Sequence, residues 1–403
     1  MEKKKTWMKP RHRLVTAIAR LVLAPYSRLR YGISVEKFKQ QGNRAYLILY
    51  NHQTAFDQFF VGMSFRGPIY YLATEDIFSL GWLSKLLRWA IGPIPIRKQT
   101  TDITAVMNCI KVAREGGSIC IAPEGNRTYS GRTEYMSDSI ASLAKKLKMP
   151  IALYRIEGGY GVQPRWSDVV RKGTMRGYVS RVIEPEEYAD LKPMELFGLI
   201  EEGLYVDEAV ADGTFRHPKR GEFLERAIYV CPHCGLAEFE SQGHRITCKQ
   251  CGRTVLYGED KRLQGEGFDF PFQFAAQWYD YQKQYVNSLD VTAMTQVPLF
   301  RDRAAVSEVI VYKKKNLLRP DAAISLYGDR MVLDEGEAEE LVIPFSEVSA
   351  AACLGKNKLN IYHGKMIYQF KGSKRFNALK YVNLYFRYRN LTKGDSNDQF
   401  LGL

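Results

Sequence analysis

The stretch Ala45–Asp57, with the sequence AYLILYNHQTAFD, decides the fold of the first half of the chain. Its first six residues, AYLILY, form an apolar run, which is typical of a strand buried on both faces of a sheet. The run stops at Asn51, His52 follows, and Asp57 comes five positions later, where a helical apolar pattern begins. The stretch therefore predicts a strand, a turn and a helix, with a histidine and an aspartate at the junction.

His52 and Asp57 can meet in only one of two simple arrangements. Positions five apart on one straight helix lie about 140° from each other, so the pair does not share a helix face. The two meet if His52 lies in the turn after the strand and Asp57 in the first helical turn, where the helix N-terminus favours a carboxylate. That position is the carboxyl end of a strand, where open α/β sheets bind ligands.

A neutral imidazole next to a carboxylate suits general base catalysis. The imidazole accepts a proton near pH 7, and a carboxylate on the other ring nitrogen fixes the tautomer and stabilises the imidazolium. By itself, however, the pair also fits a capped helix beside an ordinary buried histidine. The other segments decide between the two interpretations.

Strand-like and helix-like segments alternate from residue 45 to about residue 190. This alternation predicts an α/β fold, with a mostly parallel sheet and helices on both of its faces. The predicted strands include 69–72, 118–122 and 151–154, and the predicted helices include 80–90 and one that begins after Thr101 or Asp102.

Two motifs follow the histidine–aspartate stretch. The first is Gly92-Pro93-Ile94-Pro95-Ile96-Arg97-Lys98, in which two prolines fix an extended loop that ends in two cations. The second is Pro123-Glu124-Gly125-Asn126-Arg127, directly after the strand SICIA, where the glycine permits a sharp turn and the arginine offers a planar fork suited to phosphate. A strand that opens at Pro150 comes next. In this order, the motifs resemble those of the glycerolipid acyltransferase family, that of 1-acylglycerol-3-phosphate acyltransferases, over roughly residues 40–190. Asn126 departs from the family, which most often has threonine there.

The resemblance implies a set of roles. His52 would be the general base for a glycerol hydroxyl, and Asp57 would orient it. The alkoxide would attack the thioester of an acyl-coenzyme A or acyl-carrier protein, with backbone amides near the helix start as candidate oxyanion donors. The acceptor, a lysophospholipid, would be lined by Glu124, Gly125 and Arg127, with Arg127 and Arg97 on its phosphate.

The N-terminus is strongly basic and amphipathic. The chain has 403 residues and a net charge of +14, which implies an anionic partner. Residues 13–24 are apolar, end at Pro25 and are too short to span a bilayer. On a helix, one side carries Leu14, Val15, Ile18, Leu21 and Val22, and the other carries Arg13, Thr16 and Arg20, as in helices that lie in the interface of an anionic membrane. The alternative is a terminal helix that packs on the domain. We expect a peripheral protein at the cytoplasmic face of a membrane.

A second unit contains two C-x-x-C pairs, Cys231 with Cys234 and Cys248 with Cys251, each followed by glycine. Four thiolates fill a tetrahedral zinc site, so the pairs predict a ribbon with structural zinc. Such ribbons often bind nucleic acid, but the charge here is mixed and basic residues do not cluster with aromatic ones. We therefore do not expect nucleic acid as the partner.

The chain is expected to divide into five segments. Residues 268–300 carry an aromatic stripe, which predicts a packing face or alternatively a membrane-interface belt. Residues 305–390 show strands followed by one helix, a pattern that resembles a pleckstrin-homology-like domain. The predicted segments are the membrane-contacting N-terminus 1–34, the acyltransferase domain 35–215, the zinc ribbon 227–258, the connector 268–300 and the β domain 305–390.

The sequence therefore predicts a membrane acyltransferase with two appended modules. The alternative, from a different class, is a non-catalytic lipid- or nucleic-acid-binding zinc protein on an acyltransferase scaffold. Acyl chain length, the donor carrier and the acceptor headgroup do not follow from the residues.

Overall fold

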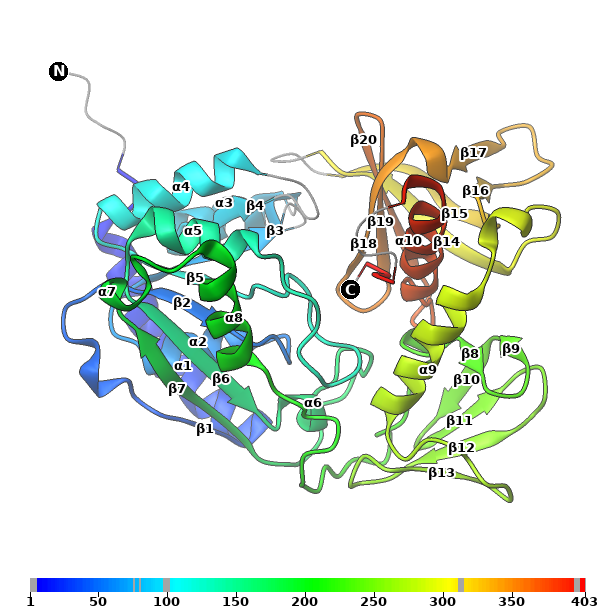
Figure 1. The fold of residues 1–403 in the computed structure, drawn as a ribbon, viewed down its shortest axis with the longest axis horizontal. Helices are drawn as coiled ribbons and strands as arrows, with labels where there is room; N and C mark the ends of the chain where they lie inside the picture. The colour runs from blue at the N-terminus through cyan, green and yellow to red at the C-terminus, as the bar shows by residue number, and fades with distance from the viewer. Residues whose placement is uncertain are drawn as a thin grey trace. The chain divides into compact units, whose positions relative to one another are not determined.

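The computed structural model describes residues 6–74, 77–79, 81–96, 102–310, 315–394 and 399–402. The chain divides into two compact units, coloured by residue number in Figure 1. Unit 1 comprises Met1–Pro164 and Val170–Phe215, and unit 2 comprises Arg165–Val169 and Arg216–Leu403. Each unit is described separately below.

Unit 1 is built on a seven-stranded sheet in the order β1-β7-β6-β2-β5-β3-β4. All neighbouring strands are parallel except β6 and β7, so the predicted α/β fold with a mostly parallel sheet is confirmed. The strands are β1 (Ile33–Val35), β2 (Leu47–Tyr50), β3 (Ile69–Thr74), β4 (Ile94–Ile96), β5 (Ser118–Ile121), β6 (Ile151–Glu157) and β7 (Met175–Ile183).

Helices cover both faces of this sheet, as the sequence predicted. They are α1 (Pro10–Tyr31), α2 (Asp57–Ser64), α3 (Trp82–Ile91), α4 (Ile103–Arg114), α5 (Ser139–Leu147), α6 (Gly159–Val162), α7 (Pro185–Tyr188) and α8 (Pro193–Leu204). The side chain of Asp102 caps α4 by accepting a hydrogen bond from the amide of Ala105.

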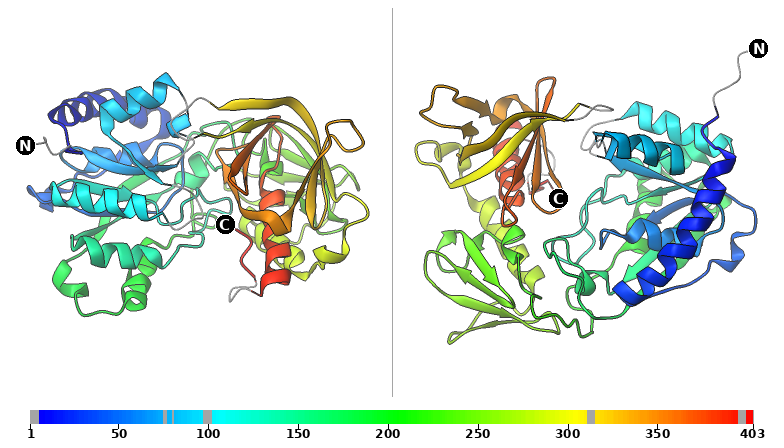
Figure 2. Two further views of the ribbon diagram at one scale, coloured as in Figure 1. Left: turned by 90° about the horizontal axis from the view of Figure 1, so that it is seen from above. Right: turned by 180° about the vertical axis from the view of Figure 1, so that it is seen from behind.

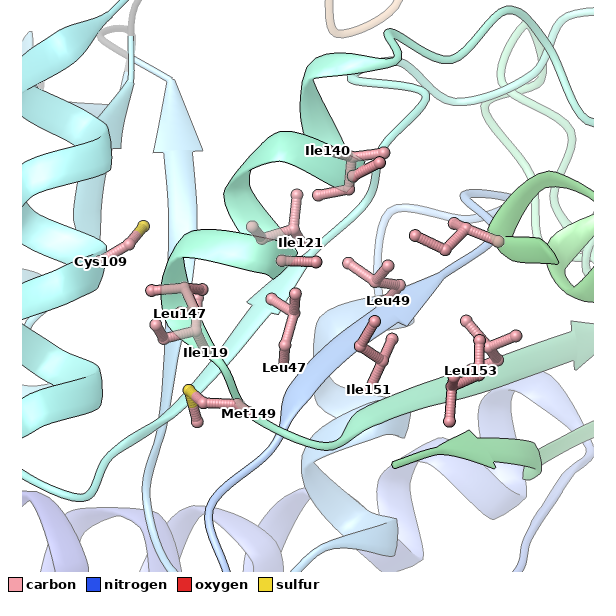
Figure 3. Close-up of a cluster of buried hydrophobic side chains, with 14 of the residues drawn as sticks. Leu47, Leu49, Cys109, Ile119, Ile121, Ile140, Leu147, Met149, Ile151 and Leu153 are labelled. Carbon is pink, nitrogen blue, oxygen red and sulfur yellow. The ribbon is translucent and has the colours of Figure 1, made fainter. Parts of the chain in front are cut away.

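Strand β2 shows how the sheet is buried on both sides. Leu47 and Leu49 point to one face, where they pack with residues of α4, α5 and α8 (Figure 3). Ile48 and Tyr50 point to the other face, where they pack with residues of α2 and the end of α1. Successive side chains of a strand alternate between faces, so an uninterrupted apolar run is what a doubly covered strand requires.

Helix α1 differs from the sequence prediction in length and agrees with it in its amphipathic pattern. It was expected to stop at Pro25 but continues to Tyr31. Pro25 removes the hydrogen bond to the carbonyl of Leu21, whose side chain is 78% exposed, so water can reach this turn and the helix tolerates the proline. The helix crosses one side of unit 1 (Figure 2, dark blue).

Two polar side chains of α1 contact the domain, whereas Arg13, Arg28 and Arg30 are exposed. Arg20 donates hydrogen bonds to the backbone carbonyls of Gly62 (2.7 Å) and Gly67 (2.6 Å), and His12 contacts the hydroxyl of Tyr70. The apolar side is exposed and carries Leu14, Ile18, Leu21, Val22 and Leu29. Within the described part of the chain, no helix combines the length and apolarity needed to cross a bilayer.

Unit 2 begins with a ribbon of short antiparallel strands. A two-stranded piece, β8 (Val230–Cys231) with β9 (Gly235–Leu236), precedes a four-stranded sheet. The sheet consists of β10 (Phe239–Gln242), β11 (Arg245–Cys248), β12 (Thr254–Tyr257) and β13 (Leu263–Gly265). Helix α9 (Ala275–Ser288) packs on the ribbon through Trp278, whose ring lies 5.4 Å from that of Phe239 on β10 and whose indole donates to the carbonyl of Val230 on β8 at 2.8 Å. The aromatic stripe is therefore a packing face at Trp278.

The rest of unit 2 is a seven-stranded antiparallel sheet followed by α10 (Leu379–Lys393). Its order is β17-β16-β15-β14-β20-β19-β18. The strands are β14 (Phe300–Glu308), β15 (Asn316–Leu326), β16 (Arg330–Leu333), β17 (Leu341–Pro344), β18 (Val348–Leu354), β19 (Lys358–His363) and β20 (Met366–Gly372). Buried polar contacts such as Tyr229 Oη to Asn383 Oδ1, 2.7 Å, join this sheet's helix to the ribbon.

Candidate functional site

The structure brings His52 and Asp57 together at the carboxyl end of β2. Helix α2 begins at Asp57, and His52 lies in the turn before it. The Nδ1 atom of His52 is 2.8 Å from Oδ2 of Asp57. The Asp57 side chain is fully buried, whereas that of His52 is 20% exposed. One ring nitrogen is therefore fixed by a carboxylate, while the ring itself reaches the surface.

Asp57 is held by donors of its own turn. Its Oδ2 accepts from the amides of Gln53 (2.6 Å) and Thr54 (2.9 Å), and its Oδ1 accepts from the hydroxyl of Thr54 (2.6 Å). The spacing His-x-x-x-x-Asp thus closes a tight turn in which the carboxylate accepts hydrogen bonds from the turn's own amides and orients the imidazole. The sequence prediction did not include Thr54, because any threonine at this position could equally have faced solvent.

Glu124 links the His52 turn to the segment after β5. Its Oε1 accepts from the amide of His52 (2.8 Å), and its Oε2 accepts from the amide of Glu134 (3.0 Å). The amide of Thr128 donates in turn to the carbonyl of His52 (3.1 Å). Strands β2 and β5 are parallel neighbours with Leu49 opposite Ile121, which brings the residues that follow each strand to the same level. Burial raises the pKa of Glu124 to about 8, against the opposing effect of the two amide donors.

Two further contacts fix the loops at this edge, and the sequence prediction missed both. Asn51 forms a pair of 2.8 Å hydrogen bonds with the backbone of Ile156 on β6. Beyond Glu124, the hydroxyls of Thr128 and Ser130 both donate to Glu134 Oε1. The only signal for these partners was their position after a strand, which does not identify a contact across the sheet.

The predicted acceptor residues are placed as follows. Gly125 is exposed and has a φ of +64°, so its left-handed conformation favours glycine. Arg127 is half-buried in the same loop. Arg97 lies outside the described residues, directly after β4.

The backbone amides of the turn before α2 already have acceptors within the chain. The amides of residues 52–56 each donate to an acceptor within the chain: Glu124, Asp57 twice, Gln163 and the Thr54 hydroxyl. These five amides already hold the turn together, and the expectation that amides near the helix start stabilise a tetrahedral oxyanion stays a prediction for the other amides there.

An aromatic surface adjoins the pair. The ring of Phe56, the residue before Asp57, lies 5.9 Å from the ring of Tyr26 on α1 and 5.3 Å from that of Phe59 on α2. Tyr26 and Phe59 are both exposed. Apolar surface thus continues from the exposed side of α1 to the residue next to the catalytic candidates.

The four cysteines of unit 2 form one cluster. The Sγ atoms of Cys231, Cys234, Cys248 and Cys251 all lie within 4.8 Å of one another, and those of Cys231 and Cys251 are 3.9 Å apart. A tetrahedral zinc ion with bonds of about 2.3 Å to sulfur requires sulfur atoms about 3.8 Å apart. The donor set and its size therefore fit zinc.

Comparison with known proteins gives a family match within unit 1 and two similar proteins. Residues 33–156 match the family model described as Acyltransferase. The 1-acyl-sn-glycerol-3-phosphate acyltransferase of Bacillus subtilis (strain 168) is 21% identical over 178 residues, which are 44% of this chain and 86% of that protein. The crystal structure of the 1-acyl-sn-glycerophosphate (LPA) acyltransferase, PlsC, from Thermotoga maritima covers 48% of this chain and 78% of its own, at 15% identity and a TM-score of 0.40.

The α/β sheet with a histidine–aspartate pair, together with the family match over the same residues, defines an O-acyltransferase. Residues 33–156 therefore form an acyltransferase-family domain, and the chain is similar over part of its length to a 1-acyl-sn-glycerol-3-phosphate acyltransferase. The matched range contains His52, Asp57, Glu124, Gly125 and Arg127. The family resemblance inferred from these motifs is confirmed.

Proposed function

We propose that the protein transfers a fatty acyl group to the free hydroxyl of lysophosphatidic acid or a related lysophospholipid or glycerol phosphate. The donor is a thioester, acyl-coenzyme A or acyl-carrier protein. The observation that carries the proposal is the 2.8 Å contact between His52 Nδ1 and the buried carboxylate of Asp57. The name of the Bacillus relative supports the acceptor class.

In this mechanism His52 is the general base. With its Nδ1 proton donated to Asp57, Nε2 carries the lone pair and removes the proton of the acceptor hydroxyl as the oxygen attacks the thioester carbon. The tetrahedral intermediate then expels the thiolate. The imidazolium returns the proton to the thiolate sulfur, so the free thiol leaves and the ester remains.

Glu124 acts as a positioning residue in this scheme. Both of its oxygens accept backbone amides, one from His52 itself and one from Glu134. These hydrogen bonds fix the position of the His52 turn relative to the loop that carries Gly125 and Arg127. We assign the acceptor phosphate to Arg127, whose planar fork suits a phosphate, and to Arg97.

The exposed side of α1 suits a bilayer surface. Its leucines and isoleucine face outward while Arg20 and His12 face the domain, the reverse of an ordinary surface helix. We propose that this side lies in the interface of an anionic membrane, at the cytoplasmic face, where the soluble donor is present. The aromatic surface of Tyr26, Phe56 and Phe59 then leads the acceptor's hydrocarbon chain from the bilayer to His52.

Zinc is proposed as a structural ion of unit 2. Cys231, Cys234, Cys248 and Cys251 would hold it and leave no position for a substrate. The ion would cross-link the two C-x-x-C pairs and would take no part in acyl transfer.

The test is acyl transfer to lysophosphatidic acid in lipid vesicles, with purified protein and both donors. His52→Ala should abolish transfer. The matched control is His363→Ala, which removes a second histidine–carboxylate pair (His363 Nε2 to Glu347 Oε2, 2.9 Å) in unit 2. Equal losses in both variants, or transfer that persists in His52→Ala, would refute the assignment of the base.

A further inference from the structure

The apolar side of helix α3 is exposed, and its buried side is polar. Its one fully buried side chain is polar: Ser84, 5% exposed, whose hydroxyl donates to the carbonyl of Ile77 at 2.6 Å. Its two tryptophans are largely exposed, Trp82 at 74% and Trp89 at 53%, and Leu86 is 46% exposed. An amphipathic helix of a soluble protein normally turns its apolar stripe to the core. Here the stripe points away from the domain.

A helical projection places the exposed apolar residues in one band. At about 100° per residue, Trp82, Leu86 and Trp89 fall within about 60° of one another, and Ser84 lies on the opposite side. Lys85 and Arg88, both exposed, lie along one flank of the band. Tryptophan beside lysine and arginine is the composition of helices that lie at the headgroup level of a membrane.

Helix α3 is joined to the N-terminal end of α1. Arg11 donates from Nε to the carbonyl of Trp89 at 2.8 Å, and its guanidinium stands 5.3 Å from the centre of the Trp89 ring. The indole of Trp7 donates to the carbonyl of Gly92, just after α3, at 2.8 Å. The exposed sides of the two helices are thereby linked through a cation.

We propose that α3 is a second membrane-contacting helix, and that Trp82, Leu86 and Trp89 enter the same bilayer interface as the apolar side of α1. The proposal rests on the membrane association proposed above. It assigns α3 to lipid rather than to a protein partner because cations flank its apolar band and because that band adjoins α1, whose own apolar side is exposed. An anionic bilayer complements both the charge and the apolar surface.

The first experiment is tryptophan fluorescence of the full chain with vesicles of phosphatidylcholine and phosphatidylglycerol that contain lipid brominated in its acyl chains. The chain has five tryptophans, of which Trp166 and Trp278 are buried. We expect bromine quenching in the wild type, and we expect most of it to disappear in the double variant Trp82→Phe, Trp89→Phe.

The second experiment measures partition onto the same vesicles by co-sedimentation. Trp82→Ser with Trp89→Ser should weaken partition at least about tenfold, given what burial of a large apolar side chain contributes. Lys85→Gln with Arg88→Gln should weaken it only when the vesicles contain phosphatidylglycerol. The matched control is Met194→Ser on α8, because Met194 is 60% exposed and α8 covers the face of the sheet opposite α2 and the end of α1.

The outcomes distinguish membrane contact by α3 from the membrane association proposed for α1. Vesicle binding that persists in the Trp82→Ser, Trp89→Ser variant, without bromine quenching in the wild type, overturns the assignment of α3 and leaves α1 as the membrane contact. Failure of the wild type to bind any of these vesicles overturns both. Self-association of the wild type that the tryptophan variant loses, again without quenching, shows that α3 covers a second copy of the chain and overturns the lipid assignment.

Discussion

Replacing Asp57 by asparagine tests how the carboxylate acts on His52. Four donors converge on Asp57: the His52 ring, the amides of Gln53 and Thr54, and the Thr54 hydroxyl. Two of them are backbone amides, which donate only. Both reach Oδ2, where the His52 ring also donates, and the Thr54 amide is shared with Oδ1 at 3.0 Å. The hydroxyl on the Oδ1 side can turn and accept. The asparagine oxygen should therefore take the Oδ2 position and its NH₂ should face Thr54.

This orientation keeps the His52 tautomer and removes only the negative charge. An ion pair about 4 Å apart is worth about 4 kcal/mol at an effective dielectric of about 20, and partial exposure of the ring reduces this value. A loss of about 2 to 4 kcal/mol of transition-state stabilisation corresponds to about 30- to 1000-fold in rate. If instead the NH₂ faced His52 and imposed the wrong tautomer, the loss would be about 10⁴-fold, as in the serine-protease triad.

The assay measures kcat/KM for acyl transfer to lysophosphatidic acid. The variant His52→Ala defines the rate without the base, and Thr54→Ser is a control that keeps the hydroxyl. Asp57→Asn should fall between wild type and His52→Ala. A loss as large as that of His52→Ala would refute the orientation argument. Activity within about threefold of wild type would show that the charge contributes little to the reaction.

Three further predictions concern stability. Because burial raises the pKa of Glu124 to about 8, its protonated form is favoured in the folded state. Its stabilising contribution is complete below the ordinary value of 4.5 and is lost as pH rises through about 8. Urea unfolding of the wild type should therefore weaken between pH 5 and 8 relative to Glu124→Gln, by up to about 1.4 kcal/mol per pH unit, and parallel pH curves would contradict this. Removal of zinc by a chelator, or Cys231→Ser, should abolish a metal content of one ion per chain and lower the unfolding temperature; unchanged melting of the metal-free protein would argue against a structural ion. Gly235→Ala should destabilise more than Gly252→Ala: both have positive φ, but only at Gly235 would a Cβ meet another group, the Tyr285 hydroxyl at 2.3 Å. Equal melting temperatures would rule out the steric argument.

The strand, turn and helix around His52 could be predicted because each rests on a local pattern. The apolar run AYLILY required a doubly covered strand, and the five-residue spacing allowed one arrangement in which His52 and Asp57 meet. The function of Glu124 could not be predicted in the same way. Its partners are backbone amides 72 and 10 residues away in sequence, and an amide carries no residue-specific signal. The same holds for the pair of bonds between Asn51 and Ile156.

The amphipathic pattern of α1 was visible in the sequence, but the side of the helix that faces the domain was not. The same stripe fits a helix with its leucines in the core and a helix with its leucines exposed. The deciding contacts are those of Arg20 with the carbonyls of Gly62 and Gly67, which are tertiary and hold the side chain of Arg20 against the domain. In α3 the deciding residue is Ser84, and nothing in its sequence context separates a buried serine from an exposed one.

The exposed sides of α1 and α3 bear on the chemistry through the C-terminal end of α1. There Tyr26 contacts Phe56, the residue that precedes Asp57, and Tyr31 lies 5.2 Å from the same ring. In the proposed reaction, the lysophospholipid carries a polar head that has to reach His52 and a chain that is costly to expose to water. The aromatic surface next to Phe56 would shield the chain, and Arg127, in the loop after β5, would bind the head. The lipid would then not have to leave the bilayer completely. Helix α1 would then orient the enzyme as well as attach it, because lowering its apolar side into the interface brings Phe56, and with it the His52 turn, towards the membrane surface.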